Sequence, residues 1–147
     1  MTDAGRCPEC GARRCAELFH ALLALDHSRA RPWGPLHGVS VACFLLQHPG
    51  RLPGDGGAVA RAFLRAYLEG GLPAVEELVG RARRANAHRV PGGPARTVEP
   101  APAPPTGGFA VTVEHVAVDG TFPAAGFPER VRAWAAATLE AWAGHGG

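Results

Sequence analysis

Apolar residues recur at helical spacing in two stretches near the start of the chain. In residues 14–27 they share one side of a predicted helix: Leu18, Phe19, Leu22, Leu23 and Leu25. Residues 28–35 interrupt this pattern, because their prolines and glycine cannot continue a helix. A second helix is predicted over residues 35–47. It begins with proline and is nearly all apolar between Val39 and Leu46, so we expect it to be buried on most sides.

The middle of the chain predicts two more helices. One begins near Asp55 and ends at the glycine pair 70–71, which is typical of a helix C-terminus. Its inner face is expected to carry Val59, Phe63, Tyr67 and Leu68. The next helix is predicted over residues 73–87, ends in a run of arginines, and should pack through Val75, Leu78 and Val79.

The last third changes in character. Residues 90–108 are dominated by proline, glycine and alanine, which favours an extended linker over a packed core. Residues 109–118, FAVTVEHVAV, alternate and are rich in β-branched side chains, so they predict a strand. A lone strand is unstable; it must lie on the helices, pair with a short segment, or pair with another chain in a homodimer. A final amphipathic helix over residues 128–143 should bury Val131, Trp134, Leu139 and Trp142.

Charge and composition limit the classes of function. The net charge is only +2, and the one concentrated basic run lies at residues 81–84, which argues against a nucleic-acid partner. The N-terminus lacks the basic start and apolar run of a signal peptide, and no stretch approaches the length of a membrane span. We therefore expect a soluble cytoplasmic protein, in which closely spaced cysteines indicate metal or redox chemistry before disulfides.

Three early cysteines, Cys7, Cys10 and Cys15, have the spacing C-x2-C-x4-C. In the sequence CPECG the proline and glycine allow a tight turn, so that two thiolates face one ion. Redox C-x2-C motifs usually begin a helix that follows a strand, and no strand is predicted before Cys7. The sequence therefore favours structural zinc over a redox site or unligated thiols.

A closed tetrahedral zinc site needs a fourth ligand. The candidates are His20, His27, His37, Cys43 and His48. If the first two helices pack antiparallel, Cys15 at the start of one lies beside His48 at the end of the other. His37 lies about 16 Å before His48 along the helix, too far to share its ion, and His20 lies a turn and a half into the first helix. The apolar surroundings of Cys43 indicate a core residue, and the alternative role of His48 is a helix cap. The predicted ligands are Cys7, Cys10, Cys15 and His48.

The same helical geometry predicts a second cluster at the far end of this hairpin. Asp26 follows Cys15 by about three turns and shares its face, whereas His37 shares the face of His48. Asp26 and His37 should therefore meet, with His27 nearby. Such a pair can be a general base, a metal site or a structural hydrogen bond, and the apolar surroundings of His37 favour the last.

These motifs resemble a small bacterial family, the domain of unknown function 5946. The resemblance rests on CPECG, on Cys15 opening a helix, and on His37-x10-His48 within HGVSVACFLLQHPG. It covers residues 7–85 and extends less firmly to the C-terminal segment. Members have the pattern V-H-x-L-x-V-D-A-Y-x-V-Q-H-P-G, of which QHPG is the most specific part.

The chain departs from the family pattern at two positions. Ala42 stands where the pattern has Asp, and Phe44 stands where it has Tyr. If the family carboxylate does chemistry, this chain has lost it. The resemblance implies no activity, but it supports the importance of five residues: Cys7, Cys10, Cys15, His37 and His48.

Together these features predict a mostly α fold, a zinc-stapled helical bundle with a short C-terminal β element and a final amphipathic helix. We expect a zinc-clamped helical domain in residues 1–88, a linker in 89–108, and a strand–helix segment in 109–147 that packs on the bundle. The expected function is a zinc-binding interaction or accessory module with a structural metal and an unknown protein or small-molecule partner. The alternative is a small metal-dependent enzyme that uses Asp26 and His37.

Overall fold

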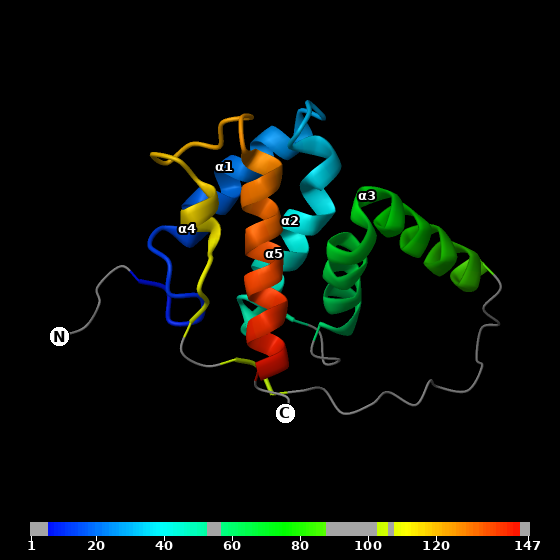
Figure 1. Ribbon diagram of the computed structural model, residues 1–147. Helices are drawn as coiled ribbons and strands as arrows, with labels where there is room; N and C mark the ends of the chain where they lie inside the picture. The colour runs from blue at the N-terminus through cyan, green and yellow to red at the C-terminus, as the bar shows by residue number, and fades with distance from the viewer. Residues whose placement is uncertain (1–5, 53–56, 88–102, 106–107, 145–147) are drawn as a thin grey trace.

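The computed structural model describes residues 6–52, 57–87, 103–105 and 108–144, and its regular structure is helical (Figure 1). The elements, in order, are α1 (Cys15–His27), η1 (Gly34–Leu36), α2 (His37–Leu46), η2 (Pro49–Arg51), α3 (Ala58–Ala87), α4 (Val113–Val116) and α5 (Phe127–Gly144). The prediction of a mostly α fold is confirmed.

The helices predicted from the apolar pattern are present, with shifted boundaries. The second one starts with the short 3-10 turn η1 before α2 begins at His37. The two helices predicted around the glycine pair are one element, α3, which bends into two limbs (Figure 1). The bend is at Gly71, whose φ of 71° suits glycine because it has no Cβ. Pro73 follows directly and cannot donate to the helical ladder.

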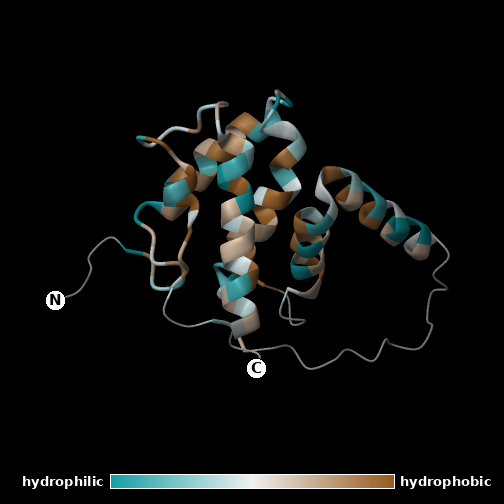
Figure 2. Cartoon of the chain, viewed as in Figure 1, coloured by the Kyte–Doolittle hydropathy of each residue, from teal (hydrophilic) through white to brown (hydrophobic). Residues whose placement is uncertain are grey.

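The core lies where α5 packs against α2 and α3, while α4 contacts both α5 and α1. Each long helix carries hydrophilic and hydrophobic residues (Figure 2), and the hydrophobic ones provide the core. Fully buried side chains include Leu22, Leu46, Leu64, Val131 and Trp134. The expectation for Val59 is wrong: this side chain is 74% exposed, because it precedes the fully buried Leu64 by five residues and so lies about 140° away from it around α3.

The strand predicted over residues 109–118 is wrong. Residues 113–116 form the single helical turn α4, and the β pairing within the described residues consists of two isolated bridges, Arg6 with Arg13 and Val118 with Thr121. Thr112 begins the turn through a capping box, in which its backbone N–H donates to Nδ1 of His115 over 3.0 Å. Val113 and Val116 are both buried, and their spacing of three residues suits a helical turn. No described strand lies beside this segment to complete a ladder.

Hydrogen bonds join the C-terminal segment to α2 and to the turn before η1. The indole N–H of Trp142 donates to the carbonyl of Leu46 over 2.9 Å, and that of Trp33 donates to the carbonyl of Phe122 over 2.8 Å.

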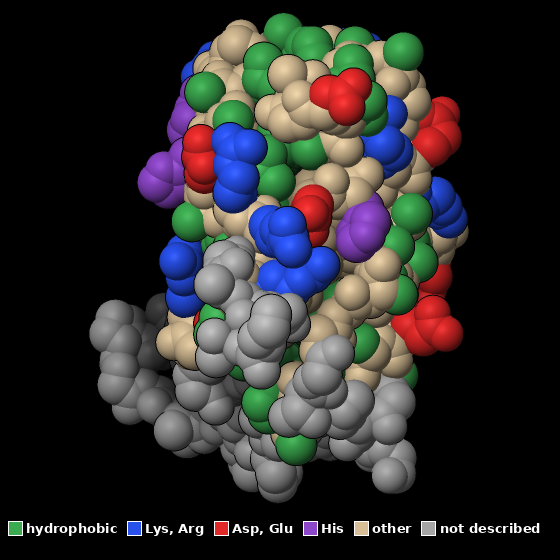
Figure 3. Space-filling model, turned by 90° about the vertical axis from the view of Figure 1, so that its left-hand side faces the viewer, with side chains coloured by type: hydrophobic (Ala, Val, Ile, Leu, Met, Phe, Trp, Pro, Cys, Tyr) green, Lys and Arg blue, Asp and Glu red, His purple; other side chains and the backbone are tan. Residues whose placement is uncertain are grey.

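The predicted linker at 89–108 falls mostly outside the described residues, so the division into domains stays a prediction. In the described part of the chain no helix is long and apolar enough to cross a membrane. Basic, acidic and histidine side chains are interspersed with apolar ones on the face shown in Figure 3.

Candidate metal centre

The CPECG segment forms a tight loop before α1. The backbone N–H of Gly11 donates to the carbonyl of Cys7 over 2.9 Å, and the N–H of Cys7 donates to the carbonyl of Ala12 over 2.8 Å. Gly11 has a φ of 85°, which glycine adopts without strain. The N–H of Ala12 points at the sulfur of Cys10 over 3.4 Å. This loop holds two thiols on its inner side.

The third thiol belongs to Cys15, the first residue of α1. Arg14 precedes it in the left-handed region, with a φ of 56°, and its guanidinium forms an ion pair with Glu17 over 2.7 Å. The left-handed residue turns the chain from the loop into the helix. Cys15 is half-buried, as is Cys7, whereas Cys10 is only 1% exposed.

The imidazole comes from His48, two residues beyond the end of α2. Its Nδ1–H donates to the carbonyl of Phe44 over 2.7 Å, and its ring stacks on that of Phe44 with 4.0 Å between centroids. Phe44 in turn stacks on Phe19 of α1. With Nδ1 protonated, Nε2 carries the free lone pair. Nε2 is buried and has no hydrogen-bond partner among the described residues.

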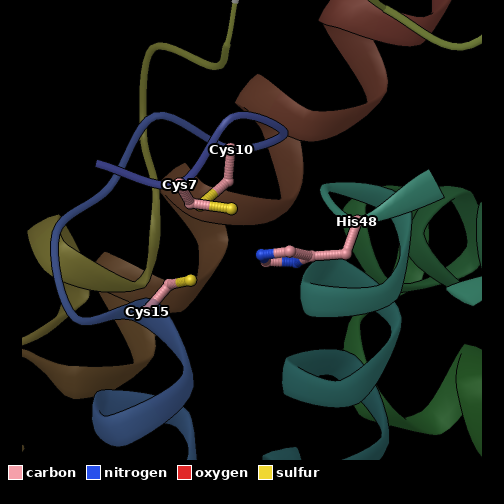
Figure 4. Close-up of side chains that lie close together, drawn as sticks. All are labelled: Cys7, Cys10, Cys15 and His48. Atoms are coloured by element: carbon pink, nitrogen blue, oxygen red, sulfur yellow. The ribbon is translucent and has the colours of Figure 1, made fainter. Parts of the chain in front are cut away.

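Four potential ligand atoms converge at this point. The sulfurs of Cys7, Cys10 and Cys15 and a ring nitrogen of His48 all lie within 4.8 Å of one another. Figure 4 shows the thiols and the imidazole pointing toward a common centre from the loop, the start of α1 and the end of α2. Among the described residues this is the one group of three or more such side chains that could hold a metal ion.

A hydrogen bond between Glu9 and Gly50 connects the two segments beside the cluster. Glu9 lies between the first two cysteines, and its carboxylate accepts the backbone N–H of Gly50 over 2.8 Å. Gly50 follows His48 and Pro49 in the turn η2. The bond therefore joins the cysteine loop to the segment that carries the histidine. The sequence interpretation missed Glu9, although an acidic residue between two thiols is a visible signal.

A family model described as a family of unknown function (DUF5946) matches residues 5–143. The chain belongs to this family. The match covers all four residues of the cluster, and it confirms the resemblance inferred from CPECG and QHPG. Comparisons with curated proteins and with solved structures gave no match.

The electrostatics of the cluster leave the histidine neutral and keep two of the three thiols protonated while no ion is bound. Burial raises the pKa of Cys10 and of Cys15, and the neighbouring Cys7 thiol adds to the second shift. Burial opposes ionisation of Cys7 too, but hydrogen bonds to its sulfur, led by those of the Cys10 and Glu9 backbone, leave its pKa lowered. Burial lowers the pKa of His48, so its imidazole stays neutral. The histidine is thus in its ligating form, whereas at least two thiols must lose protons when an ion binds.

The rival ligands lie elsewhere. His20 is exposed on α1, and Cys43 is fully buried in the core, where burial raises the pKa of its thiol well above the usual range. His27 and His37 lie at the opposite end of the α1–α2 pair, one at the last residue of α1 and the other at the first residue of α2.

Asp26 and His37 meet as the helical geometry predicts. Oδ2 of Asp26 lies 2.9 Å from Nδ1 of His37, and the ring centroids of His27 and His37 are 5.7 Å apart. Burial raises the pKa of Asp26, although both histidines act in the opposite direction.

Gln47 is a second residue that the sequence interpretation missed. Its amide nitrogen donates to the carbonyl of Val111 over 2.8 Å and to the hydroxyl of Thr138 over 2.9 Å. The hydroxyl of Thr138 in turn donates a hydrogen bond to the carbonyl of Trp134. Gln47 is 1% exposed and directly precedes His48, so it fixes the end of α2 against α5. The available signal was a polar residue directly after a nearly all-apolar helical run.

Proposed function

We propose that this protein is a zinc-binding interaction or accessory module whose metal is structural. The observation that carries the proposal is the buried Nε2 of His48, which has no hydrogen-bond partner among the described residues and points at three thiols. A buried polar atom without a partner is costly. An ion on this nitrogen removes that cost.

The donor set favours zinc among the common metals. Three thiolates and one imidazole are soft and borderline ligands, and zinc accepts such a set in tetrahedral geometry. The carbonyl of Phe44, which accepts the Nδ1–H of His48, is the kind of outer partner that orients a ligating histidine.

The same set favours a structural role over catalysis. Four protein ligands leave no position for water or substrate, and catalytic zinc sites usually keep one open. The ligands come from the cysteine loop, the start of α1 and the residues just after α2, so one ion would link three separate segments. Reduced thiols in such a site fit a cytoplasmic location, where disulfides are rare.

Elemental analysis tests the metal. Protein made without a histidine tag and purified in reductant, without chelator, should hold about one zinc per chain. Cys10→Ser should release it and lower the free energy of unfolding by several kcal/mol, since binding and folding are linked. Cys43→Ala is the matched control, because this cysteine lies outside the cluster; it should keep its zinc. Protein without zinc, or zinc that survives Cys10→Ser, would contradict the proposal.

The accessory role implies a partner, either another protein or a small molecule, and a homodimer is one form that it can take. Sedimentation equilibrium of the zinc-loaded protein measures the homodimer directly.

A second candidate function, a small metal-dependent enzyme, is favoured by the hydrogen bond between the buried carboxylate of Asp26 and the surface imidazole of His37.

A further inference from the structure

The Asp26–His37 pair combines a buried carboxylate with an accessible imidazole. The side chain of Asp26 is 0% exposed, whereas that of His37 is 44% exposed. An ionised carboxylate can only accept hydrogen bonds, so Nδ1 of His37 carries the proton toward Asp26. In the neutral ring the lone pair then lies on Nε2, at the other edge of the imidazole.

The carboxylate of Asp26 makes one hydrogen bond among the described residues. Oδ2 of Asp26 contacts His37, and the buried Oδ1 has no hydrogen-bond partner among the described residues. Within the described structure its hydrogen bonding is therefore directed at one imidazole. Carboxylates that hold the Nδ1–H of a histidine in this way are typical outer partners of metal ligands, because they fix the tautomer and increase the basicity of the ring.

His27 provides a second imidazole at a suitable distance. It is the last residue of α1, it is exposed, and its ring centroid lies 5.7 Å from that of His37 with 45° between the ring planes. Zinc–nitrogen bonds are about 2.0–2.1 Å, so two imidazoles on one tetrahedral ion place their ring centres roughly 5–6 Å apart. The observed spacing falls within that range.

We infer that His27 and His37 form a second, open site for a divalent transition-metal ion, with Asp26 as the residue that orients His37. Imidazole nitrogens suit zinc, nickel and copper ions. Two protein ligands leave coordination positions for water or for an external molecule, unlike the four-ligand cluster at the other end of the hairpin. The inference is independent of that cluster, since the two sites share no residue.

Zinc binding by the full chain without a histidine tag tests the inference. Protein loaded with one zinc per chain is dialysed against increasing zinc concentrations, and bound zinc is measured at each step. We expect a second, weaker equivalent. His27→Gln and His37→Gln should each remove it and leave the tight equivalent in place. His20→Gln is the matched control: this exposed histidine lies on nearly the same face of α1, two turns before His27, and its loss should change neither equivalent.

Asp26→Asn tests the positioning role. It should weaken the second equivalent about 10- to 100-fold, the usual effect of removing an outer partner. Nitrogen-15 spectra of His37 distinguish metal binding from a purely structural role. In the unmodified protein, zinc should shift the Nε2 signal of His37 while Nδ1 stays protonated, and a purely structural pair would show no such shift.

The outcomes separate the two proposals. Absence of a second equivalent overturns this inference, as does a second equivalent that survives both His27→Gln and His37→Gln or is lost in His20→Gln. Absence of the tight equivalent overturns the structural-zinc proposal instead. Retention of the tight equivalent in the histidine and Asp26 variants shows that they fold.

Discussion

Replacement of Gln47 by leucine should destabilise the protein although it leaves every potential zinc ligand in place. Leucine keeps the approximate size of the side chain but removes both amide hydrogen bonds, to the carbonyl of Val111 and to the hydroxyl of Thr138. Each net hydrogen bond contributes about 1 kcal/mol, and buried acceptors that lose their donors add to the cost. The expected loss is about 2–4 kcal/mol.

Urea denaturation of the zinc-saturated proteins measures this loss. In a thermal melt of this chain of 147 residues, the same loss of stability corresponds to a decrease in Tm of roughly 6–12 °C, at about 3 °C per kcal/mol. The slope of the denaturation curve should stay unchanged, because the surface exposed on unfolding is nearly the same.

A double-mutant cycle with Thr138→Val identifies the cause. Valine has nearly the shape of threonine, so the cycle removes the hydroxyl that Gln47 contacts. The two substitutions should be non-additive by about 1 kcal/mol or more, because residues in one hydrogen-bond network are coupled. A loss below about 1 kcal/mol for Gln47→Leu, or strictly additive effects, would refute the role assigned to this side chain.

Three further predictions concern α5 and the cluster. Trp142→Phe should cost about 1–3 kcal/mol in a chemical denaturation experiment, because it leaves the buried carbonyl of Leu46 without its donor; no loss would contradict the contact. Zinc binding at pH 7 should release about two to three protons, since thiolates are the ligands; calorimetry in buffers of different ionisation enthalpy measures the number, and zero release would exclude the thiols. Acid should release zinc: burial lowers the pKa of His48, so the stability provided by its neutral imidazole is present above the unfolded pKa of about 6.5 and is lost as the pH falls through the window below it. A chromophoric chelator follows that release, and zinc retained at about pH 4 would contradict the ligand set.

Both ends of the α1–α2 hairpin were predictable from the sequence. A helix has a fixed rise and a fixed number of residues per turn, so spacing along the chain gives position along the helix and the face of each side chain. Once two helices are joined by a short breaker, this arithmetic places Cys15 beside His48 and Asp26 beside His37. The structure brings both pairs together.

Contacts between distant segments were beyond this arithmetic. The alternating residues 109–118 suit a strand by local preference, but a strand requires a neighbouring strand, and α1 and α5 offer that segment only helical surfaces. Gln47 has partners 64 and 91 residues away, and nothing in its local sequence indicates them. Likewise, the spacing of the cysteines indicates an ion, but only the folded backbone, through the carbonyl of Phe44, decides which nitrogen of His48 faces it. Local periodicity depends on neighbouring residues alone, whereas hydrogen-bond partners and ring tautomers depend on what the whole chain brings to each buried atom.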